Sequence, residues 1–441
     1  MPLGSRKIIV CVLSFISFCL YPGFAFANDN GGDGTEFNDK DREVRWEIDG
    51  GGQVRLKGDF AKNQNFTNFT FTPAHNEAQF LERTRLQASI ENRSLNLEIF
   101  IQGQWYGRWG GVDNCSDFDL YQGYIEWEKV LNLPVSLKAG RQEFLYGSAF
   151  LIGTNDFYNG LSWDGFKTSI RPFEKLAVDI LGVKMVELNS EDPDVYVAGL
   201  YTTYKTYKEG SLEGYLFYNK GGFPISHREF VLIDSGQKSF TLGARLAGKI
   251  GGFDYELEPQ FQWGKVKTAL GDGRDLVTAF GGHIDLGYTF KLPWEPRLFG
   301  AYAYGSGDNN PFDRRYREFH GSIYNDSYIF GDTNVIADLS GVTVNDVHAS
   351  GLQIWIGGLQ VKPLPKLGVT LRAHRFLANR VPSGFSKNIG TEVDSDISYK
   401  LTKGISFLVG LNRFFTGRFF RQAWGSGKNI DYAYVQAQVE F

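Results

Sequence analysis

The last eleven residues, 431–441, read DYAYVQAQVEF and from residue 432 on alternate in polarity. One parity carries the apolar residues Ala433, Val435, Ala437, Val439 and Phe441. The residues between them are two tyrosines, two glutamines and one glutamate. Successive side chains of a β-strand point to opposite faces, so this segment is predicted to be a strand with one apolar and one polar face.

The start of the chain is not expected to belong to the fold. A basic beginning and an apolar run at 8–20 lead to the small residues AFA at 25–27. Residues 1–27 are therefore predicted to be a cleaved secretory signal peptide, because the run is too short to span a bilayer comfortably. Residues 28–43 are rich in Gly, Asp and Asn and predict a flexible periplasmic leader. The folded part is predicted at 44–441.

Composition limits what this folded part can be. The chain has 53 glycines, 15% aromatic and 22% charged residues, a net charge of −4 and a mean hydropathy of −0.27. No second long apolar run follows, which excludes spanning helices and leaves a closed barrel as the other way to cross a membrane. Beyond the predicted signal peptide Cys115 is the one cysteine, so no disulfide framework is expected, and no C-x-x-C-H motif offers a haem site. Neither a cofactor, a metal nor a nucleic-acid partner is expected.

Segments of about ten residues with the same alternation recur along the chain, as in transmembrane barrels. Eighteen strands are predicted, at 44–60, 80–92, 95–105, 119–129, 135–143, 163–171, 175–187, 195–204, 210–218, 238–249, 253–263, 275–290, 297–305, 352–362, 368–376, 391–401, 405–415 and 431–441. The number is even, which suits an antiparallel ring. A ring of this size is wide enough to leave an aqueous channel.

The connections between these strands alternate between long and short. The gaps at 61–79 and 144–162 are long, whereas those at 93–94 and 130–134 are tight. All long connections would then emerge at one end, as in outer-membrane barrels with short periplasmic turns and long external loops. The predicted fold is an all-β, transmembrane, antiparallel up-and-down β-barrel of about 18 strands in a Gram-negative outer membrane. Outer-membrane lipid is its expected surroundings, and the barrel-assembly machinery is expected to recognise the last strand through Phe441.

Three stretches resemble the alginate-export family of outer-membrane porins. They are GRQEFLYGSAFLIG with NDFYNGLSWDGFK inside 140–167, YGSGD at 304–308, and EVDSDISYKLTKGISFLVGLNRFFTG at 392–417. The resemblance implies an eighteen-stranded barrel, in agreement with the count above. The best-known member of the family exports the anionic polysaccharide alginate through a lumen rich in arginine. Many members have no established substrate, so the resemblance implies a passage and does not fix the solute.

Parity assigns side chains to the lumen. Leu86, Ala88 and Ile90 share one face, so Arg83 and Arg85 would face water. The residues predicted to line the pore or contact substrate are Arg83, Arg85, Lys138, Arg141, Glu143, Asp164, Lys167, Arg245, Arg372, Glu392 and Asp394. Two interpretations stay open. An arginine rung would contact an anionic solute, because guanidinium fits carboxylates; alternatively, charges of both signs pair across strands and leave a weakly selective lumen.

Three of these residues conflict with parity. Arg141, Glu143 and Asp164 fall on the lipid-facing side of their strands, where a charge is tolerated only near the interface. A bulge at Gly140 would turn them inward at the external end of the strand. The connection that follows, 144–162, is long and apolar enough to fold into the lumen and narrow it.

Catalysis is not expected. The six histidines are scattered and mostly in predicted loops, and the motifs G-x-S-x-G and H-E-x-x-H are absent. The longest connection, 306–351, contains Asp308 and nearby Asn and Asp residues that could bind Ca²⁺. It lacks the EF-hand pattern, and a lid or an exposed tip is the favoured interpretation of this connection.

The expected function is passive diffusion of an anionic or polar saccharide, or a similar hydrophilic solute, through an outer-membrane porin of the alginate-export type. The alternative is a structural sheath that houses a periplasmic or secreted partner, such as a cytochrome conduit or a secretion component.

Overall fold

A computed structural model describes residues 46–66, 69–111, 114–186, 195–206, 209–221, 238–267, 273–308, 310, 315–320 and 327–441. The predicted signal peptide at 1–27 and the predicted leader at 28–43 lie outside these ranges. Within the described ranges, no helix is long and apolar enough to cross a bilayer.

The described chain is one sheet of twenty strands. The strands are β1 Trp46–Asn65, β2 Thr70–Asn92, β3 Leu97–Trp109, β4 Cys115–Trp127, β5 Val135–Gln142, β6 Trp163–Phe173, β7 Leu176–Met185, β8 Tyr196–Lys205, β9 Glu209–Lys220, β10 Lys238–Ile250, β11 Phe253–Lys267, β12 Gly273–Thr289, β13 Arg297–Gly305, β14 Arg315–Tyr316, β15 Gly341–Val344, β16 Val347–Leu364, β17 Leu367–Arg380, β18 Asn388–Lys400, β19 Ile405–Thr416 and β20 Ile430–Glu440. Short helices η1 Val130–Asn132, η2 Tyr328–Phe330 and α2 Arg418–Trp424 lie in the connections. The strands β14 and β15 lie inside the connection from β13 to β16, so eighteen strands form the wall.

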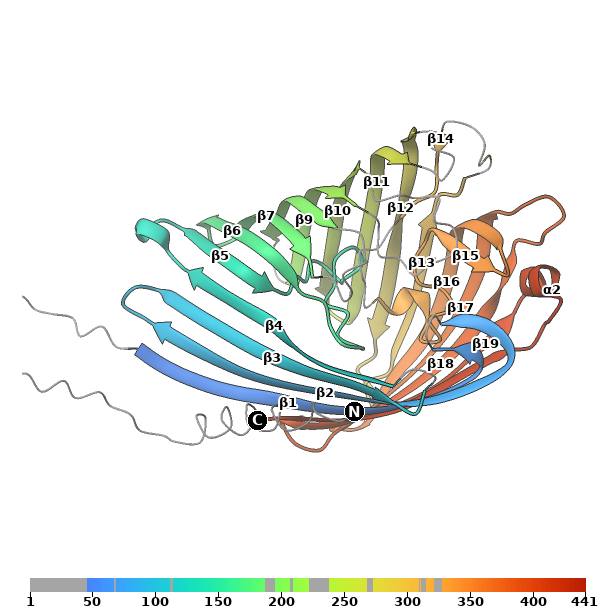
Figure 1. The fold of residues 1–441 in the computed structure, drawn as a ribbon, viewed down its shortest axis with the longest axis horizontal. Helices are drawn as coiled ribbons and strands as arrows, with labels where there is room; N and C mark the ends of the chain where they lie inside the picture. The colour runs from blue at the N-terminus through green and yellow to red at the C-terminus, as the bar shows by residue number, and fades with distance from the viewer. Residues whose placement is uncertain are drawn as a thin grey trace, which may run out of the picture.

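The wall closes on itself. Each wall strand pairs antiparallel with its neighbour along the chain, and β1 also pairs with β20, from Gln53 opposite Glu440 to Lys62 opposite Asp431 (Figure 1). Closure leaves no unpaired sheet edge, which is the condition for strands to cross a membrane. The predicted eighteen-stranded antiparallel barrel is confirmed, and each predicted wall strand corresponds to one observed strand.

The two faces of the terminal strand are as predicted from its alternation. Tyr432 and Tyr434 are buried inside the barrel, whereas Val435 and Val439 are exposed on its outer face. The same division holds in β2, where Arg83 and Arg85 are buried inside. Outward aliphatic and aromatic side chains therefore meet lipid, and the inward set lines the interior.

The seam between β1 and β20 depends on a glycine. The amide of Gly52 donates to the carbonyl of Phe441 at 2.8 Å, and the amide of Phe441 donates to Gly52 at 3.0 Å. A Cβ at Gly52 would lie 2.7 Å from Cζ of Phe441, closer than side chains pack. Glycine therefore lets the terminal aromatic ring lie against β1.

The first hairpin is longer than predicted. The expected loop at 61–79 is mostly strand, because pairing continues from Ala61 opposite Glu77 to Asn65 opposite Thr70, with one irregularity after Lys62. Most of these residues are polar, and the apolar Ala61 and Phe71 are buried inside, so the outward apolar row ends while the backbone ladder continues.

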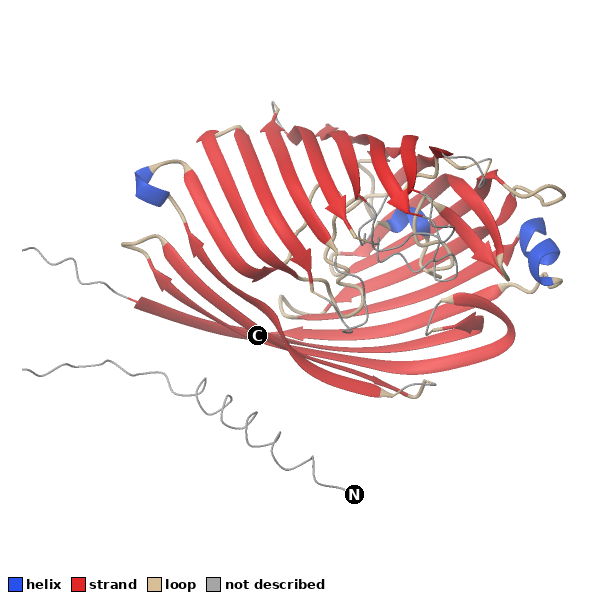
Figure 2. Cartoon of the chain, turned by 45° about the horizontal axis from the view of Figure 1, so that its top comes forward, coloured by secondary structure: helices blue, strands red, loops and turns tan. Residues whose placement is uncertain are grey.

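Two connections from the long-loop end fold into the barrel. Figure 2 shows loop segments running inside the ring of strands. In the β5–β6 connection (143–162), Phe150 is fully buried, and in the β13–β16 connection (306–346), Phe319 and Ile336 are too. The predicted infolding of 144–162 is confirmed, and the connection favoured as a lid or an exposed tip also packs inside.

Candidate functional site

The β5–β6 connection crosses the interior from wall to wall. The ring of Tyr146 stacks on Tyr201 of β8 with centroids 4.4 Å apart. The ring of Phe150 contacts His283 of β12, also at 4.4 Å. Phe157, further along the connection, meets a tyrosine of β20 at 5.2 Å. Strands on different sides of the ring thus hold one loop, which must narrow the lumen.

The centre of this loop is held by three inward arginines, Arg55 of β1 and Arg83 and Arg85 of β2, which we call the arginine cradle. All three guanidinium groups face the carboxylate of Asp156. The nitrogen–oxygen distances are 2.7 Å from Arg55, 2.9 Å from Arg83 and 3.4 Å from Arg85. The cradle side chains are at most 8% exposed, whereas the Asp156 side chain is 45% exposed. The loop carboxylate therefore caps a cluster of buried cations.

The cradle also binds the backbone of the loop. Arg83 donates to the carbonyl oxygens of Asp156 and Tyr158, both at 3.0 Å, and Arg85 donates to Asn159 at 3.3 Å. Arg55 donates to the Asp156 carbonyl as well. Three loop residues, Asp156, Tyr158 and Asn159, are thereby held by one patch of barrel wall. If the Asp156 carboxylate moved out of the cradle, the arginines would still be bonded to the backbone of the loop.

The charges at this patch do not cancel. Glu143, just past the end of β5, lies 3.8 Å from Arg85 and accepts a hydrogen bond from Tyr121. Three arginines against two carboxylates leave one net positive charge. Burial alone would raise the pKa of Asp156, but the neighbouring guanidinium groups outweigh burial and hold that pKa below its ordinary value. Asp156 is therefore an anion at neutral pH, held by an excess of cations.

The second infolded connection, from β13 to β16, is held by a part of the wall that is rich in carboxylates. Arg372 of β17 pairs with Asp332 of the loop at 2.9 Å and with Asp396 of β18 at 2.5 Å. Glu392 accepts hydrogen bonds from the amide and hydroxyl of Thr333, at 2.8 and 2.6 Å. Burial, followed by repulsion from Asp396 and Asp394, raises the pKa of Asp332 against the effect of Arg372. This part of the wall is acidic.

The two loops meet inside the barrel. The amide of Asn334 donates to the hydroxyl of Tyr158, and the rings of Phe150 and Phe330 stack 6.5 Å apart. The constriction is therefore built jointly, with a basic wall at β1 and β2 and an acidic wall at β17 and β18.

Most of the remaining predicted pore-lining residues face inward and are paired. Lys138 contacts Glu126 at 3.0 Å and lies directly opposite Lys167 in the sheet. Arg245 pairs with Glu213 at 2.7 Å and with Glu256 at 3.0 Å. Glu392 and Asp394 are fully buried beneath the second loop. Outside the arginine cradle, the basic groups of the lumen largely have carboxylate partners on the wall.

Arg141 and Asp164 require a correction. They form an ion pair at 2.8 Å and continue the outward rows of β5 and β6, next to exposed Leu137 and Phe166. The register from β4 to β5 runs without a shift through Gly140, so no bulge turns these two residues inward. The structure thus corrects the prediction that they line the pore. Glu143 does lie inside, because the chain has left the strand by that residue.

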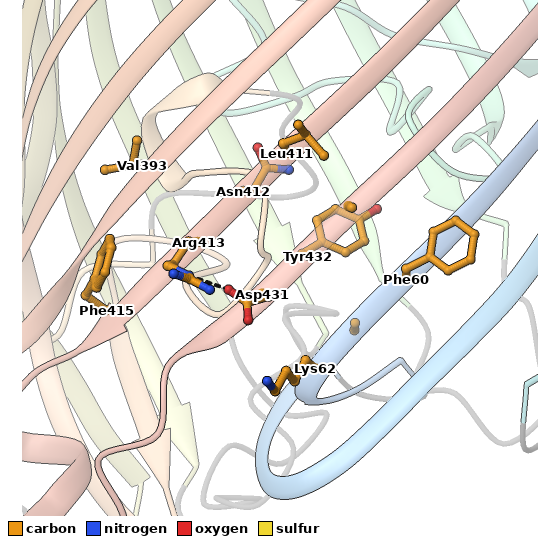
Figure 3. A pocket seen from close by; sticks show the side chains of 11 residues that line it. Phe60, Lys62, Val393, Leu411, Asn412, Arg413, Phe415, Asp431 and Tyr432 are labelled. Atoms are coloured by element: carbon orange, nitrogen blue, oxygen red, sulfur yellow. Dashed lines mark hydrogen bonds and ion pairs between the residues drawn. The ribbon is translucent and has the colours of Figure 1, made fainter.

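A cavity of about 590 Å³ lies on the outer face of the barrel instead of in the lumen. It is lined by Phe60, Leu411 and Phe415, which are exposed outward, and by an ion pair between Arg413 and Asp431 at 2.5 Å (Figure 3). Its position facing lipid separates it from the path of a solute.

Sequence reasoning missed Asp156, although it found Arg83 and Arg85, two of the three arginines that hold it. No local pattern distinguishes this aspartate, which reaches the cradle from a loop more than seventy residues away. The calcium candidate at Asp308 has other partners: it accepts from the amide of Asn310 and lies 3.6 Å from Arg317.

Comparison with protein families gives one match over most of the chain. The family model described as alginate export matches residues 51–434. No match was found among curated proteins. The match includes the wall strands from β2 to β19, parts of β1 and β20, and both infolded connections.

Solved structures share the architecture at low identity. OpdL of Pseudomonas aeruginosa has a TM-score of 0.59 at 11% identity, covering 90% of this chain and 99% of its own. A BenF-like porin from Pseudomonas fluorescens Pf-5 has a TM-score of 0.58 at 10% identity, covering 90% and 98%. OccK2 (OpdF) of P. aeruginosa, solved in complex with glucuronate, has a TM-score of 0.57 at 12% identity, covering 90% and 98%. At such identities the likeness shows the fold.

Proposed function

The chain belongs to the alginate-export family, and from this premise we propose that it conducts an anionic saccharide, or a similar hydrophilic anion, by passive diffusion. That the protein is a β-barrel channel for solutes in the Gram-negative outer membrane follows from the family and the fold. Family members and structural relatives of this kind are channels and not enzymes. The anionic character of the solute is the part proposed here.

The observation that carries the proposal is the arginine cradle with Asp156. Three guanidinium groups already hold a carboxylate at hydrogen-bonding distance, and a uronate offers the same carboxylate geometry. The exposed side of Asp156 leaves a path along which a solute carboxylate could approach and exchange with it. The glucuronate complex of OccK2 supports the idea that a barrel of this fold can accept a uronate.

The proposal combines the two interpretations of the lumen. Arg245 and Arg372 are paired on the wall and offer little to a passing anion. The cradle is different, because its arginines outnumber their carboxylate partners and its net charge is positive. Selectivity for anions would therefore arise at one rung, inside a lumen of otherwise balanced charge.

The sheath alternative is less well supported. A barrel that houses a partner needs a free bore, whereas both infolded connections bring apolar side chains such as Phe150 and Ile336 into the interior. The outer-membrane lipid and a small hydrophilic solute fit the structure as partners. Recognition of the C-terminal strand by the barrel-assembly machinery stays a proposal, in which the exposed ring of Phe441 at the seam would take part.

Current block in planar bilayers tests the proposal. Glucuronate should reduce single-channel current at lower concentration than glucose, which has the same ring and no carboxylate. The double variant Arg83→Ala/Arg85→Ala should abolish that preference. The control Arg141→Ala removes an arginine that also binds a carboxylate, but on the outer face, and should behave like the wild type. Equal block by the two sugars in the wild type would refute the anionic assignment.

A further inference from the structure

A cluster of carboxylates around His283 lies on the wall formed by β10, β11 and β12. The sequence predicted that the histidines lie mostly in loops. His283 is in β12, directly opposite Glu258 of β11 in the sheet. Strand alternation brings Glu256 and Glu258 to the same face. Three side chains with ligand atoms thus converge from two neighbouring strands.

We propose that His283, Glu256 and Glu258 bind a divalent transition-metal ion, with Zn²⁺ as the best match. One donor atom from each side chain can be chosen so that all lie within 4.8 Å of one another. Nε2 of His283 is 3.5 Å from Oε1 of Glu256 and 3.7 Å from Oε2 of Glu258. A tetrahedral ion with bonds of about 2.0–2.1 Å separates its ligands by about 3.3 Å. The two separations that involve His283 exceed this value by a few tenths of an ångström.

Two of these atoms are suited to bind a cation. Within the described part of the chain, Nε2 of His283 and Oε2 of Glu258 have no hydrogen-bond partner, and both residues are more than nine-tenths buried. Nδ1 of His283 faces the carboxylate of Asp285, which favours the tautomer with its proton on Nδ1. The lone pair of Nε2 would then face two carboxylates. That arrangement suits a proton or a metal ion on Nε2.

The surrounding contacts orient the donors as outer ligands do in metal sites. Asp285 holds the imidazole, the Tyr215 hydroxyl donates to the other oxygen of Glu258 at 2.6 Å, and Arg245 donates to both oxygens of Glu256. These bonds fix the ring and both carboxylates before any ion arrives. The loop residue Phe150 covers the imidazole and limits access of water.

The charge balance favours a divalent ion over a proton. The carboxylates of this wall are Glu213, Glu256, Glu258 and Asp285, and Arg245 contacts the three glutamates. Arg297 also interacts with Asp285, but its charge is balanced by its partner Asp254. With a neutral imidazole the cluster carries three net negative charges. A proton on His283 leaves two, whereas a divalent ion leaves one. Imidazole is a common ligand for zinc and a poor one for Ca²⁺ or Mg²⁺, so the donor set selects a transition metal.

Zinc titration of the whole protein in detergent, after treatment with a chelator, tests this site. Competition with a fluorescent zinc indicator should give one tight site per chain. His283→Gln and Glu258→Gln should each weaken binding at least tenfold, because one of three ligands is lost. His75→Gln is the control, since His75 also lies beside a carboxylate, Glu77 at 3.3 Å, but in the first hairpin. That variant should bind zinc like the wild type.

A second readout does not depend on the variants folding. X-ray absorption at the zinc edge of the wild-type protein should report a low-coordinate ion with one imidazole and oxygen ligands and no sulfur. Absence of stoichiometric zinc binding, or unchanged binding in both ligand variants, would overturn the proposal. The cluster would then be an imidazolium held between carboxylates.

Discussion

Replacing Asp156 by asparagine removes the charge that caps the arginine cradle while keeping the size of the side chain. The backbone carbonyl of residue 156 still accepts from Arg83, so the loop keeps part of its attachment. The cradle gains one net positive charge, and its anion site loses the carboxylate that competes with a solute. We therefore expect Asp156→Asn to loosen the constriction and to increase selectivity for anions together.

The size of both effects follows from the geometry. The carboxylate makes two close contacts, 2.7 Å to Arg55 and 2.9 Å to Arg83. Because Asp156 is partly exposed, each contact stabilises the docked loop by about 1 kcal/mol. Without both contacts the docked (closed) state loses about 2 kcal/mol, which lowers its population roughly 30-fold relative to the undocked (open) state. One added charge about 5 Å from a passing ion is worth about 0.8 kcal/mol in water, about fourfold in local anion concentration.

Planar bilayers at 0.1 M salt give both quantities. The reversal potential in a salt gradient reports the ratio of anion to cation permeability, and single-channel recordings report the fraction of time spent in the closed level. Salt must be low, because the Debye length is about 10 Å at 0.1 M and about 3 Å at 1 M. Glucuronate should also block the variant at lower concentration than the wild type.

Asp164→Asn is the matched control, since that carboxylate is also bound by an arginine but on the outer face. It should leave selectivity and gating unchanged.

Lowering the pH is a second way to remove the charge of Asp156. Because the pKa of Asp156 is lowered, its stabilising contribution is complete above the ordinary pKa of 3.8 and is lost as pH falls through the lower folded value. A variant with wild-type selectivity and gating, or a shift toward cations, would refute the reasoning.

Three further perturbations have defined outcomes. Phe150→Ala should weaken docking of the β5–β6 connection by about 3 kcal/mol and increase mean conductance in single-channel recordings. Gly52→Val should lower the heat-modification temperature on gels, because overpacking against Phe441 costs about 1–3 kcal/mol. The raised pKa of Asp332 keeps it neutral when docked against Asp396, so docking is strongest below the ordinary pKa of 3.8 and weakens as pH rises toward the folded value. Lower protection factors of 327–340 at higher pH, taken relative to the intrinsic base-catalysed exchange rate at each pH, would verify this, and unchanged or higher protection factors would contradict it.

The wall of the barrel is predictable because it depends on a local signal. Lipid requires an apolar residue at every second position, so parity alone placed Arg83 and Arg85 inside and Val435 outside. This alternation of apolar residues stops at the edge of the hydrocarbon layer. It therefore missed the strand pairing of Ala61 and Glu77, which the backbone ladder maintains without any apolar pattern.

The site is less predictable because its contacts are not local. Asp156 meets Arg85 across 71 positions of sequence, and nothing near Asp156 indicates that distance. At Arg141 the local signal was right and was overruled. Strand parity predicted an outward side chain, but Arg141 lies in a stretch that resembles the family, and this suggested a pore role that the register does not support. His283 joins Glu258 through neighbouring strands, a relation that appears only when the sheet register is known.

The central claim is that anionic solutes cross this barrel at a rung of three arginines. Uptake of glucuronate and of glucose into liposomes that contain the purified wild-type protein tests it most directly. Glucuronate should enter faster than glucose, and the advantage should shrink as salt is raised. Equal rates, or faster entry of glucose at low salt, would contradict the account.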